Sequence, residues 1–410
     1  GLPGLFGSGM PETLELRRLL DFMIRVCPEA GSLKIPEELA DFVVSLSEVQ
    51  ADTPFRRWQA AADLREDFRE RTRFALSGRE EALPCVRIRE ILCAFLAPVD
   101  AGITRALDLG EGLMPTYFTF AAEKYERQTK ADGSPRLSPE GLPLVSVTGF
   151  QQEPLPPFLE GPARYLAAAR PGEEDKLRRM TGLVQGSELF DRKLLMYRTS
   201  APLDHLSLEY GRIRVFTPGW LERESVFLHM EYKYLYGLLR AGLAEEFFAA
   251  VRGALIPFLD PAVYGRSILE NVSFIASSRN PDPALHGRGF VARLTGSTTE
   301  MLSIWLRLMA GPAPFCMEAR ELVFRLSPIL PDWLFDRDGC LSFTLLSRCR
   351  VRLVNRNRRP TFGKEAARVT RLRLTDLSGR EAEVMGDSLR GELALAMREG
   401  RIAALEAVLL

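Results

Sequence analysis

One segment of the chain combines a histidine and a lysine in a pattern that suits anion binding. It covers residues 216–234 and contains the Pro218-Gly219 pair, which predicts a turn. A helical pattern follows, in which His229 and Lys233 are four residues apart and therefore share a face. An imidazole beside an ammonium group can hold an anion. The alternative is a histidine satisfied inside a helix bundle, next to a lysine whose stem is buried and whose charge stays in water.

A second segment, residues 286–300, has the composition of a loop that approaches a ligand with its backbone. It begins with His286-Gly-Arg-Gly, and the sequence Thr295-Gly-Ser-Thr then starts a helical pattern. Glycines permit close backbone approach, and the first N–H groups of a helix are free to bind an anion. No Gly-Lys-Ser/Thr follows and no βαβ pattern surrounds the segment, so neither a Walker loop nor a dinucleotide fingerprint is predicted. The alternative is an ordinary glycine-rich turn with a threonine cap.

Composition narrows the classes of function. The 410 residues carry 54 Lys and Arg against 54 Asp and Glu, so no net charge attracts nucleic acid or an anionic membrane. The apolar stretches are shorter than the roughly 18 residues of a transmembrane helix, and the N-terminus has no signal-peptide pattern. We therefore expect a cytoplasmic protein.

Metal ligands and disulfide partners are scarce. The six cysteines form no Cys-x-x-Cys pair, and the only histidines are His205, His229 and His286. These spacings predict neither a zinc site nor a disulfide framework, and the sequence suggests no metal and no organic cofactor.

The elements that position these segments are predicted to be mostly helical. Apolar residues recur every three or four positions over 11–311, which is typical of amphipathic helices. The expected helices are 13–27, 36–50, 55–75, 86–107, 162–169, 223–243, 244–256 and 298–309. Long irregular stretches interrupt them at 130–157, 200–220 and 261–299, and we interpret the last two as functional loops because they carry aromatic residues, Arg and His.

The pattern changes after residue 315. Short alternating runs begin at Leu322, Leu341, Val351 and Val369 and are separated by Asp-Gly and Ser-Gly turns, which predicts strands of a small β domain. Residues 389–410 return to mixed spacing and fit neither pattern firmly.

The two anion-binding segments and four shorter ones resemble the inverting cellobiose-phosphorylase family, especially its branch acting on β-1,2-linked gluco-oligosaccharides. The shorter segments are Leu113-Met-Pro-Thr-Tyr-Phe, Phe158-Leu-Glu-Gly-Pro, Phe190-Asp-Arg-Lys-Leu-Leu-Met-Tyr and Asp260-Pro-Ala-Val-Tyr-Gly-Arg-Ser. The likeness covers nearly the whole chain. It implies a mainly α fold: residues 1–314 would be an N-terminally truncated (α/α)6-barrel catalytic domain, and 315–410 a small β-sandwich of the jelly-roll type.

The resemblance implies phosphorolysis of a β-linked gluco-oligosaccharide of the β-1,2-glucan or cellobiose type. Inorganic phosphate, as co-substrate, would attack the anomeric carbon and give α-glucose 1-phosphate, while one carboxylic acid protonates the leaving oxygen. The family's phosphate-binding histidine and Thr-Gly pair carry over to His229, Thr295 and Gly296, and Arg288 also matches the pattern. The expected sugar contacts are Trp220, Glu222, Tyr232, Tyr264 and His286, although aromatic side chains also fill cores.

The general acid departs from the family pattern. Members usually carry an aspartate in a Gly-Asp-Trp-Asn-Asp type of sequence, which this chain lacks. By spacing, Asp52 is the first candidate and Glu12 the second, and both also fit ordinary helix-capping acids. The chain begins at Gly1 without an initiator methionine and resembles a piece of a longer protein, so the acid is also expected upstream, in which case this chain alone is inactive.

Two other functions remain open. One is phosphate-independent transglycosylation of a β-glucan, and the other is noncatalytic carbohydrate binding. The family resemblance also implies a possible homodimer, and no nucleic-acid or membrane partner is expected.

Overall fold

The computed structural model describes residues 8–291 and 296–410, and their contacts divide into two compact units. Among the described residues, the N-terminal unit comprises 8–155 and the C-terminal unit comprises 156–291 and 296–410. The change from helices to strands at residue 315 therefore falls inside the second unit.

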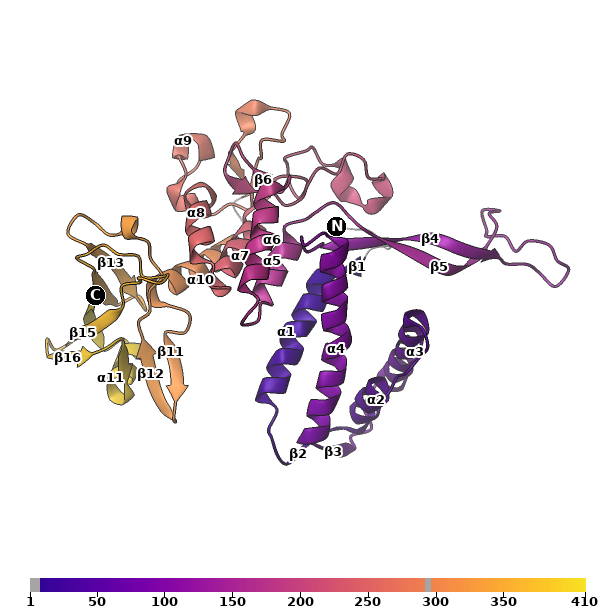
Figure 1. Cartoon of the computed structure of the whole chain (residues 1–410), viewed down its shortest axis with the longest axis horizontal. Coiled ribbons are helices and arrows are strands. Elements are labelled where there is room, and N and C mark those ends of the chain that lie inside the picture. The colour runs from indigo at the N-terminus through magenta and orange to yellow at the C-terminus, as the bar shows by residue number, and fades with distance from the viewer. Residues whose placement is uncertain (1–7, 292–295) are drawn as a thin grey trace. The chain divides into compact units, whose positions relative to one another are not determined.

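Helices α1 and α4 run side by side in the N-terminal unit, and α2 packs against both α3 and α4 (Figure 1). Their bounds are α1 (Met10–Val26), α2 (Glu37–Ser47), α3 (Pro54–Thr72) and α4 (Cys85–Leu109). The guanidinium group of Arg89 on α4 donates to the carbonyl oxygens of Ile24 and Cys27, at 2.9 and 2.7 Å. The final carbonyl groups of α1 have no partner within their own helix, so this contact closes its C-terminal end.

A long β-hairpin follows α4 and corrects the expectation of an irregular stretch at 130–157. It consists of β4 (Tyr117–Arg127) and β5 (Val145–Pro154), paired from Phe118 opposite Pro154 to Arg127 opposite Val145. Most of its side chains are exposed on both faces, so the apolar and polar alternation that marks a half-buried strand is weak. The remaining strands of this unit are β1 (Ser8–Gly9), which pairs with β4, and the pair β2 (Ser32–Pro36) and β3 (Glu80–Pro84).

Helix α7 is the core of the helical part of the C-terminal unit, and α5, α8 and α10 pack around it. The bounds are α5 (Glu160–Ala167), α6 (Glu174–Gly186), α7 (Leu228–Arg240), α8 (Ala244–Ala254), α9 (Pro261–Tyr264) and α10 (Gly296–Ala310). Leu235 and Leu238 of α7 have no exposed surface. A Cβ atom at Gly237 would lie 2.8 Å from the Cβ of Leu166, so glycine at this position allows α5 and α7 to approach closely.

Short strands and 3₁₀ helices connect these helices. The strands are β6 (Phe190–Asp191), β7 (Met196–Tyr197), β8 (Val226–Phe227), β9 (Phe274–Ile275) and β10 (Gly289–Phe290). The 3₁₀ helices of the unit are η1 (Leu208–Tyr210), η2 (Arg212–Val215), η3 (Ile256–Phe258), η4 (Pro283–Leu285) and η5 (Asp332–Leu334). The irregular stretches expected at 200–220 and 261–299 are thus mostly loops, but β9 and β10 cross the second of them.

Residues 315–410 form two sheets and one α-helix. A three-stranded sheet has the order β11 (Phe315–Glu318), β12 (Glu321–Arg325), β17 (Ser388–Arg390). A five-stranded sheet has the order β13 (Cys340–Leu345), β14 (Cys349–Val354), β18 (Ile402–Leu409), β15 (Val369–Asp376), β16 (Glu381–Met385). Helix α11 (Gly391–Arg398) connects β17 to β18. The mixed spacing of 389–410 thus corresponds to a strand end, a helix and a strand.

The expected fold class is wrong. The chain has 40% helix and 24% strand, distributed over several small sheets, and is neither mainly α nor evidently an (α/α)6 barrel. The described helices of 11–291 are interrupted by the β4–β5 hairpin and by the sheet of β8, β9 and β10. The five-stranded sheet is also mixed, because β14 and β18 are parallel, whereas a jelly roll is antiparallel.

No helix within the described residues is both long enough and apolar enough to span a bilayer.

Candidate functional site

A three-stranded sheet brings the two anion-binding segments together. Its order is β10-β9-β8, with Val226 opposite Ile275 and Ile275 opposite Gly289. The strands are two residues long, so each end of the sheet is formed directly by the loops and helices that follow. One end leads to His229 and the other to Glu224.

His229 lies at the end of the sheet where two helices begin. It is the second residue of α7, and Gly296 is the first residue of α10. A Cβ atom at Gly296 would lie 2.6 Å from Nδ1 of His229, so glycine is the residue that fits this approach. The hydroxyl of Ser297 donates to the carbonyl oxygen of Val272 at 3.0 Å and ties the start of α10 to the segment before β9. The N-terminal ends of α7 and α10 therefore converge on the imidazole.

This convergence suits an anion. The first N–H groups of each helix have no partner within the helix, and the helix dipoles place partial positive charge there. The first N–H of α7, that of Leu228, already donates to the carbonyl oxygen of Ser273 at 2.9 Å, so that group is not available to an anion. His229 is about one third exposed, and its Nε2 lies 3.6 Å from Oε1 of Glu300. When the imidazole is protonated, Glu300 stabilises its charge; the same carboxylate repels an incoming anion. Among the described residues, two helix N-termini and one imidazole thus meet at this site, with one carboxylate beside them.

An aromatic row crosses the sheet from His229 to Trp220. The rings of Phe227 and Phe274 stack with their centroids 4.8 Å apart, and those of Phe274 and Phe290 are 5.5 Å apart. The indole of Trp220 stacks on Phe290 at 3.6 Å, and Phe227 meets His229 edge to face at 5.8 Å. Phe227, Phe290 and Trp220 are partly exposed. This row gives the anion end an apolar flank of the kind that sugar rings stack on, but one face of Trp220 is already covered by Phe290.

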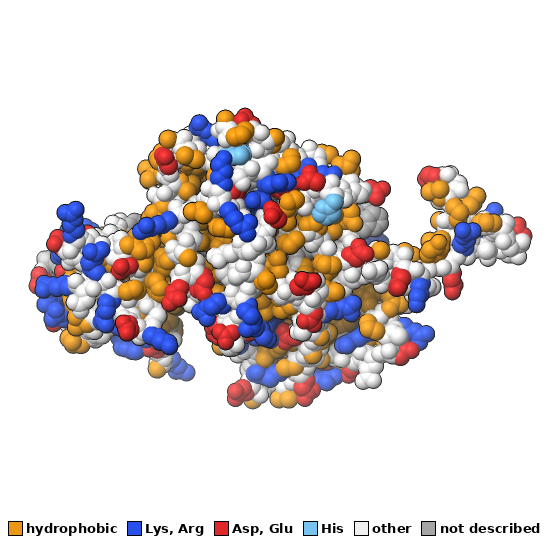
Figure 2. Space-filling view, turned by 45° about the horizontal axis from the view of Figure 1, so that its top comes forward, with side chains coloured by type: hydrophobic (Ala, Val, Ile, Leu, Met, Phe, Trp, Pro, Cys, Tyr) orange, Lys and Arg blue, Asp and Glu red, His pale blue; other side chains and the backbone are white. Residues whose placement is uncertain are grey.

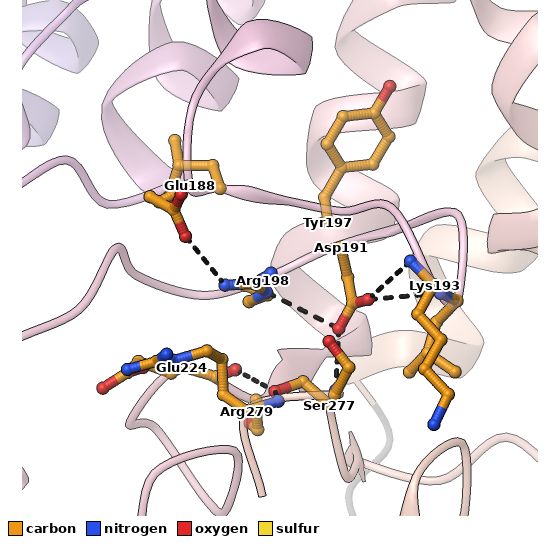
Figure 3. A network of polar contacts seen from close by, with 12 residues as sticks. Glu188, Asp191, Lys193, Tyr197, Arg198, Glu224, Ser277 and Arg279 are labelled. Carbon is orange, nitrogen blue, oxygen red and sulfur yellow. Dashed lines mark hydrogen bonds and ion pairs between the residues drawn. The ribbon is translucent and has the colours of Figure 1, made fainter.

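The opposite end of the sheet holds a compensated charge network (Figure 3). Glu224 is fully buried, and its two oxygens lie 3.4 Å from Nε of Arg223 and 2.7 Å from Nε of Arg279. Asp204 joins the same two arginines, at 2.5 Å from Nη2 of Arg223 and 3.5 Å from Nη2 of Arg279. Two guanidinium groups thus balance two carboxylates, and the buried charge of Glu224 is compensated on both of its oxygens.

The backbone also fixes this network in place. Glu224 has a φ of +58°, and its carbonyl oxygen accepts the hydroxyl of Ser277 at 2.5 Å. Arg223 donates through Nη1 to the carbonyl oxygens of Arg214 and Phe216, both at 2.9 Å. The network therefore holds the loop after η2 against the loop after β9.

Asp191 connects the β6–β7 turn to the same loop, as Figure 3 shows. Its Oδ1 accepts the backbone N–H groups of Lys193 and Leu194, and its Oδ2 accepts that of Ser278 at 2.8 Å. Arg198 lies 3.5 Å from the same carboxylate. Asp191 has no exposed surface, so it positions two loops and does not itself face a ligand.

His286 and Arg288 line this second end. Nε2 of His286 lies 2.8 Å from the carbonyl oxygen of Asn280, so that nitrogen carries the proton. Nδ1 is then free to accept from the ammonium group of Lys193, 2.7 Å away. Arg288 is exposed, and its guanidinium group lies close to Gly265. The structure thus places His286 and Arg288 directly before β10, at the opposite end of the sheet from His229.

The structure buries two of the expected sugar contacts. The Tyr232 hydroxyl donates to Oδ1 of Asn271, accepts the N–H of Ile256, both at 3.3 Å, and has no exposed surface. Tyr264 is 1% exposed and donates to the carbonyl oxygen of Glu270 at 2.7 Å. Desolvation raises the pKa of both phenols, that of Tyr264 to about 12. Both tyrosines fill the core in this structure, so the structure does not bring them to the surface of the site.

The other expected residues are distributed as follows. Glu222 is about one third exposed and lies 3.9 Å from Arg212, next to the network. Thr295 lies outside the described residues. Asp52 and Glu12 belong to the N-terminal unit: Asp52 is 65% exposed and pairs with Arg56 at 2.9 Å, one residue before the Thr53 cap of α3. Glu12 is in the first turn of α1 and is exposed. These two positions are also those of ordinary helix-start acids.

Sequence reasoning missed Asp191, Glu224, Arg223 and Arg279. Glu224 is two residues from the predicted Glu222, and its acid type alone does not distinguish it. The available signal was the density of charged residues in Glu222-Arg-Glu, within a segment that otherwise becomes apolar. In the described ranges 8–291 and 296–410, no group of three or more His, Cys, Asp or Glu is placed to hold a metal ion.

Comparison with known proteins adds no family assignment: no family model matches the chain, and no curated protein matches it either.

Proposed function

We propose that the chain carries the phosphate-binding part of an inverting glycoside phosphorylase that acts on a β-linked gluco-oligosaccharide. The observation that supports this most is the approach of Gly296 to His229, at the point where α7 and α10 begin. Phosphate would accept hydrogen bonds from the imidazole and from N–H groups in the first turns of α7 and α10, apart from that of Leu228, which already donates to Ser273. The aromatic row beside it would receive the sugar whose anomeric carbon reacts.

The reaction that this arrangement would serve is a single displacement. A phosphate oxygen forms a bond to the anomeric carbon while the bond from that carbon to the leaving sugar's oxygen breaks, with inversion. A carboxylic acid supplies the proton to the leaving oxygen. Glu224 is not our candidate for that acid, because both of its oxygens lie against arginines. Asp52 and Glu12 stay candidates for that acid.

The test is release of phosphate from α-glucose 1-phosphate with glucose, cellobiose or sophorose as acceptor. It should be run with this chain and with any longer parent protein in parallel, each with its His229→Ala variant. We expect one acceptor to support release and the variant to lose it. Oligosaccharide remodelling that is unaffected by phosphate would contradict the proposal.

One observation favours phosphate-independent transglycosylation as the second candidate. Glu300 lies 3.6 Å from Nε2 of His229, and a carboxylate there already compensates a protonated imidazole. A transferase needs no binding site for a phosphate dianion, so it would tolerate Glu300 better. Product analysis with and without phosphate separates the two functions, because a transferase makes longer and shorter glucans in either condition.

A further inference from the structure

A strongly basic stretch of the chain runs from β14 through a loop into β15. Residues 350–373 contain nine Lys and Arg but a single acid, Glu365, whereas the whole chain has equal numbers of basic and acidic residues. Figure 2 shows basic side chains close together at its left, where residues 315–410 lie. A local excess of this kind attracts anions even though the protein has no net charge.

Part of this stretch lines a hollow of about 710 Å³ on the five-stranded sheet. Four arginines contribute to its wall, namely Arg352 of β14, Arg356 of the loop after it, and Arg371 and Arg373 of β15. We call it the arginine hollow. Two carboxylates, those of Asp338 and Glu406, also line it. Its volume is in the range of sites that hold small molecules.

Strand register sets the spacing of these arginines. Arg352 of β14 is opposite Glu406 of β18, and Glu406 is opposite Arg373 of β15. Because β18 lies between the two arginine-bearing strands, Arg352 and Arg373 are about 10 Å apart at the backbone. A ligand that contacts arginines of both strands therefore needs more than one anionic group.

Acidic side chains compensate the arginine hollow only in part. Glu406 lies 3.5 Å from both Arg352 and Arg373. Glu383 lies within 3.8 Å of each of the two arginines on β15. Among the described residues, Arg356 forms no ion pair, and its side chain is exposed. Ion pairs at a surface are weak, so an anion that carries several charges can compete with these carboxylates for the guanidinium groups.

The turn that carries Arg356 is fixed by hydrogen bonds of Asn355, which has no exposed surface. The side-chain amide of Asn355 donates to the carbonyl oxygen of Arg359 at 2.7 Å. Its backbone N–H donates to the carbonyl oxygen of Gly339, also at 2.7 Å, and its own carbonyl oxygen accepts the N–H of Arg358 at 2.8 Å. A turn that is already ordered loses little conformational entropy when a ligand binds.

We propose that the arginine hollow binds a compact, soluble molecule that carries two or more phosphate groups. Guanidinium groups bind phosphate through paired N–H donors and stay charged at physiological pH. A concave site of limited volume favours a compact ligand over a membrane surface. Among the described residues that line it, none is aromatic, so it lacks the stacking platform that holds single-stranded nucleic acid. The proposal rests on residues after 315, so it is independent of the proposed phosphorylase function and of the site at His229.

The test is isothermal titration of the whole chain with inorganic tripolyphosphate and, separately, with orthophosphate. We expect a saturable site that binds tripolyphosphate at least about tenfold more tightly than orthophosphate, because each further phosphate group reaches a further charged donor. Added salt should weaken this binding. The His229→Ala variant is titrated in parallel, and the tripolyphosphate site should persist in it with unchanged affinity.

Two substitutions locate the site. Arg356→Gln and Arg371→Gln should each weaken tripolyphosphate binding about tenfold, because each removes one charged donor. Both side chains are exposed or partly exposed, so neither substitution should change the melting temperature appreciably. Arg398→Gln is the matched control: it removes the same charge from an exposed arginine of α11 that does not line the hollow, and should leave the affinity unchanged.

The proposal is overturned if tripolyphosphate binds no more tightly than orthophosphate, or if Arg356→Gln binds it as tightly as the unmodified chain does. It is equally overturned if binding disappears in His229→Ala, since tripolyphosphate would then occupy the site at His229. Tighter binding of a short single-stranded RNA, or of vesicles that contain phosphatidylserine, would make a nucleic acid or a membrane the partner of these arginines and would also contradict it.

Discussion

The two ends of the small sheet formed by β8, β9 and β10 treat charge in opposite ways. At the Glu224 end, two carboxylates are matched by two arginines; Glu224 and Arg223 are buried, whereas Asp204 and Arg279 are exposed. At the His229 end, one imidazole and the N-terminal ends of two helices face a single carboxylate, that of Glu300. A network whose charges are already balanced holds loops in place, whereas helix N-termini, with their partial positive charge, are suited to bind an anion. The Glu224 end is therefore suited to position loops, and the His229 end is suited to bind a ligand.

The largest expected effect comes from a substitution at the Glu224 end of the sheet, where the charges are balanced. We expect Glu224→Gln to lower the free energy of unfolding by about 1.5 to 3 kcal/mol, because it removes a buried charged acceptor from Arg223 and Arg279. Asp204 still pairs with both arginines and compensates part of their charge. Urea denaturation measures the change. Glu222→Gln is the matched control, since Glu222 is partly exposed and 3.9 Å from Arg212, and should change stability by less than about 0.5 kcal/mol. Equal effects of the two substitutions would show that Glu224 is not a structural residue.

Glu231 is a second buried acid, and no cation pairs with it among residues 8–291 and 296–410. Glu231 on α7 is fully buried, and its Oε1 accepts the N–H of Tyr197 at 2.8 Å. Desolvation raises the pKa of this carboxyl well above its ordinary value of 4.5. The folded protein then binds more protons than the unfolded chain above pH 4.5, so stability falls as pH rises from there toward the folded pKa.

Glu231→Gln removes this dependence, because the amide has nearly the same shape and does not titrate. Compared with the variant, the unmodified protein should lose up to about 1.4 kcal/mol of stability per pH unit above pH 5. Urea denaturation from pH 5 to pH 8 measures the difference. Parallel stability curves for the two proteins would mean that Glu231 keeps its charge in the folded state.

The sequence alone could not predict most of the difference between the two ends of this sheet, and the reasons are physical. The sequence placed His229 and Gly296 in segments with anion-binding chemistry, because helix starts, glycines and histidine spacing are local features. It did not predict the sheet that joins the segments, since strands of two residues such as β8 show no periodicity. It also favoured Glu222 over Glu224, although the buried position and the positive φ belong to Glu224.

In the fold, too, the elements with a clear local pattern were predicted, whereas features set by long-range packing were not. Helix α4 was expected at 86–107 and spans Cys85–Leu109, because its apolar residues recur with helical spacing. Among the strands after residue 315, alternation predicted β12, β13, β14 and β15 but not β11, β16, β17 or β18. The β4–β5 hairpin was missed because both of its faces are largely exposed. Its sequence therefore lacks the alternation of apolar and polar residues that marks a half-buried strand. Tyr232 was assigned to the sugar, but it is buried, and composition alone does not reveal which aromatic side chains fill a core.

A substitution with a smaller expected effect tests the His229 end of the sheet. In Gly296→Ala the added Cβ would lie 2.6 Å from Nδ1 of His229, so the ring must move. We expect phosphate affinity to fall about tenfold, which corresponds to about 1.4 kcal/mol. Isothermal titration measures the affinity. Gly182→Ala is the control, because nothing lies within 4 Å of a Cβ there, and we expect unchanged affinity with stability raised by up to about 1 kcal/mol.

The smallest expected effect concerns Asp52, in the N-terminal unit. Its pair with Arg56 is exposed, so Asp52→Asn should change stability by less than about 0.5 kcal/mol. If Asp52 is only a helix-start acid, turnover of gluco-oligosaccharides is unchanged as well. A variant that folds normally but loses turnover would instead make Asp52 the general acid.

The most direct test of the central claim, an anion site at His229 and Gly296, is an imidazole NMR titration with phosphate. The chain has three histidines, so His205→Gln and His286→Gln variants are enough to assign every ring signal. We predict that the His229 signals move in a saturable way while those of His205 and His286 stay in place. Signals of His229 that do not respond to phosphate would contradict the account.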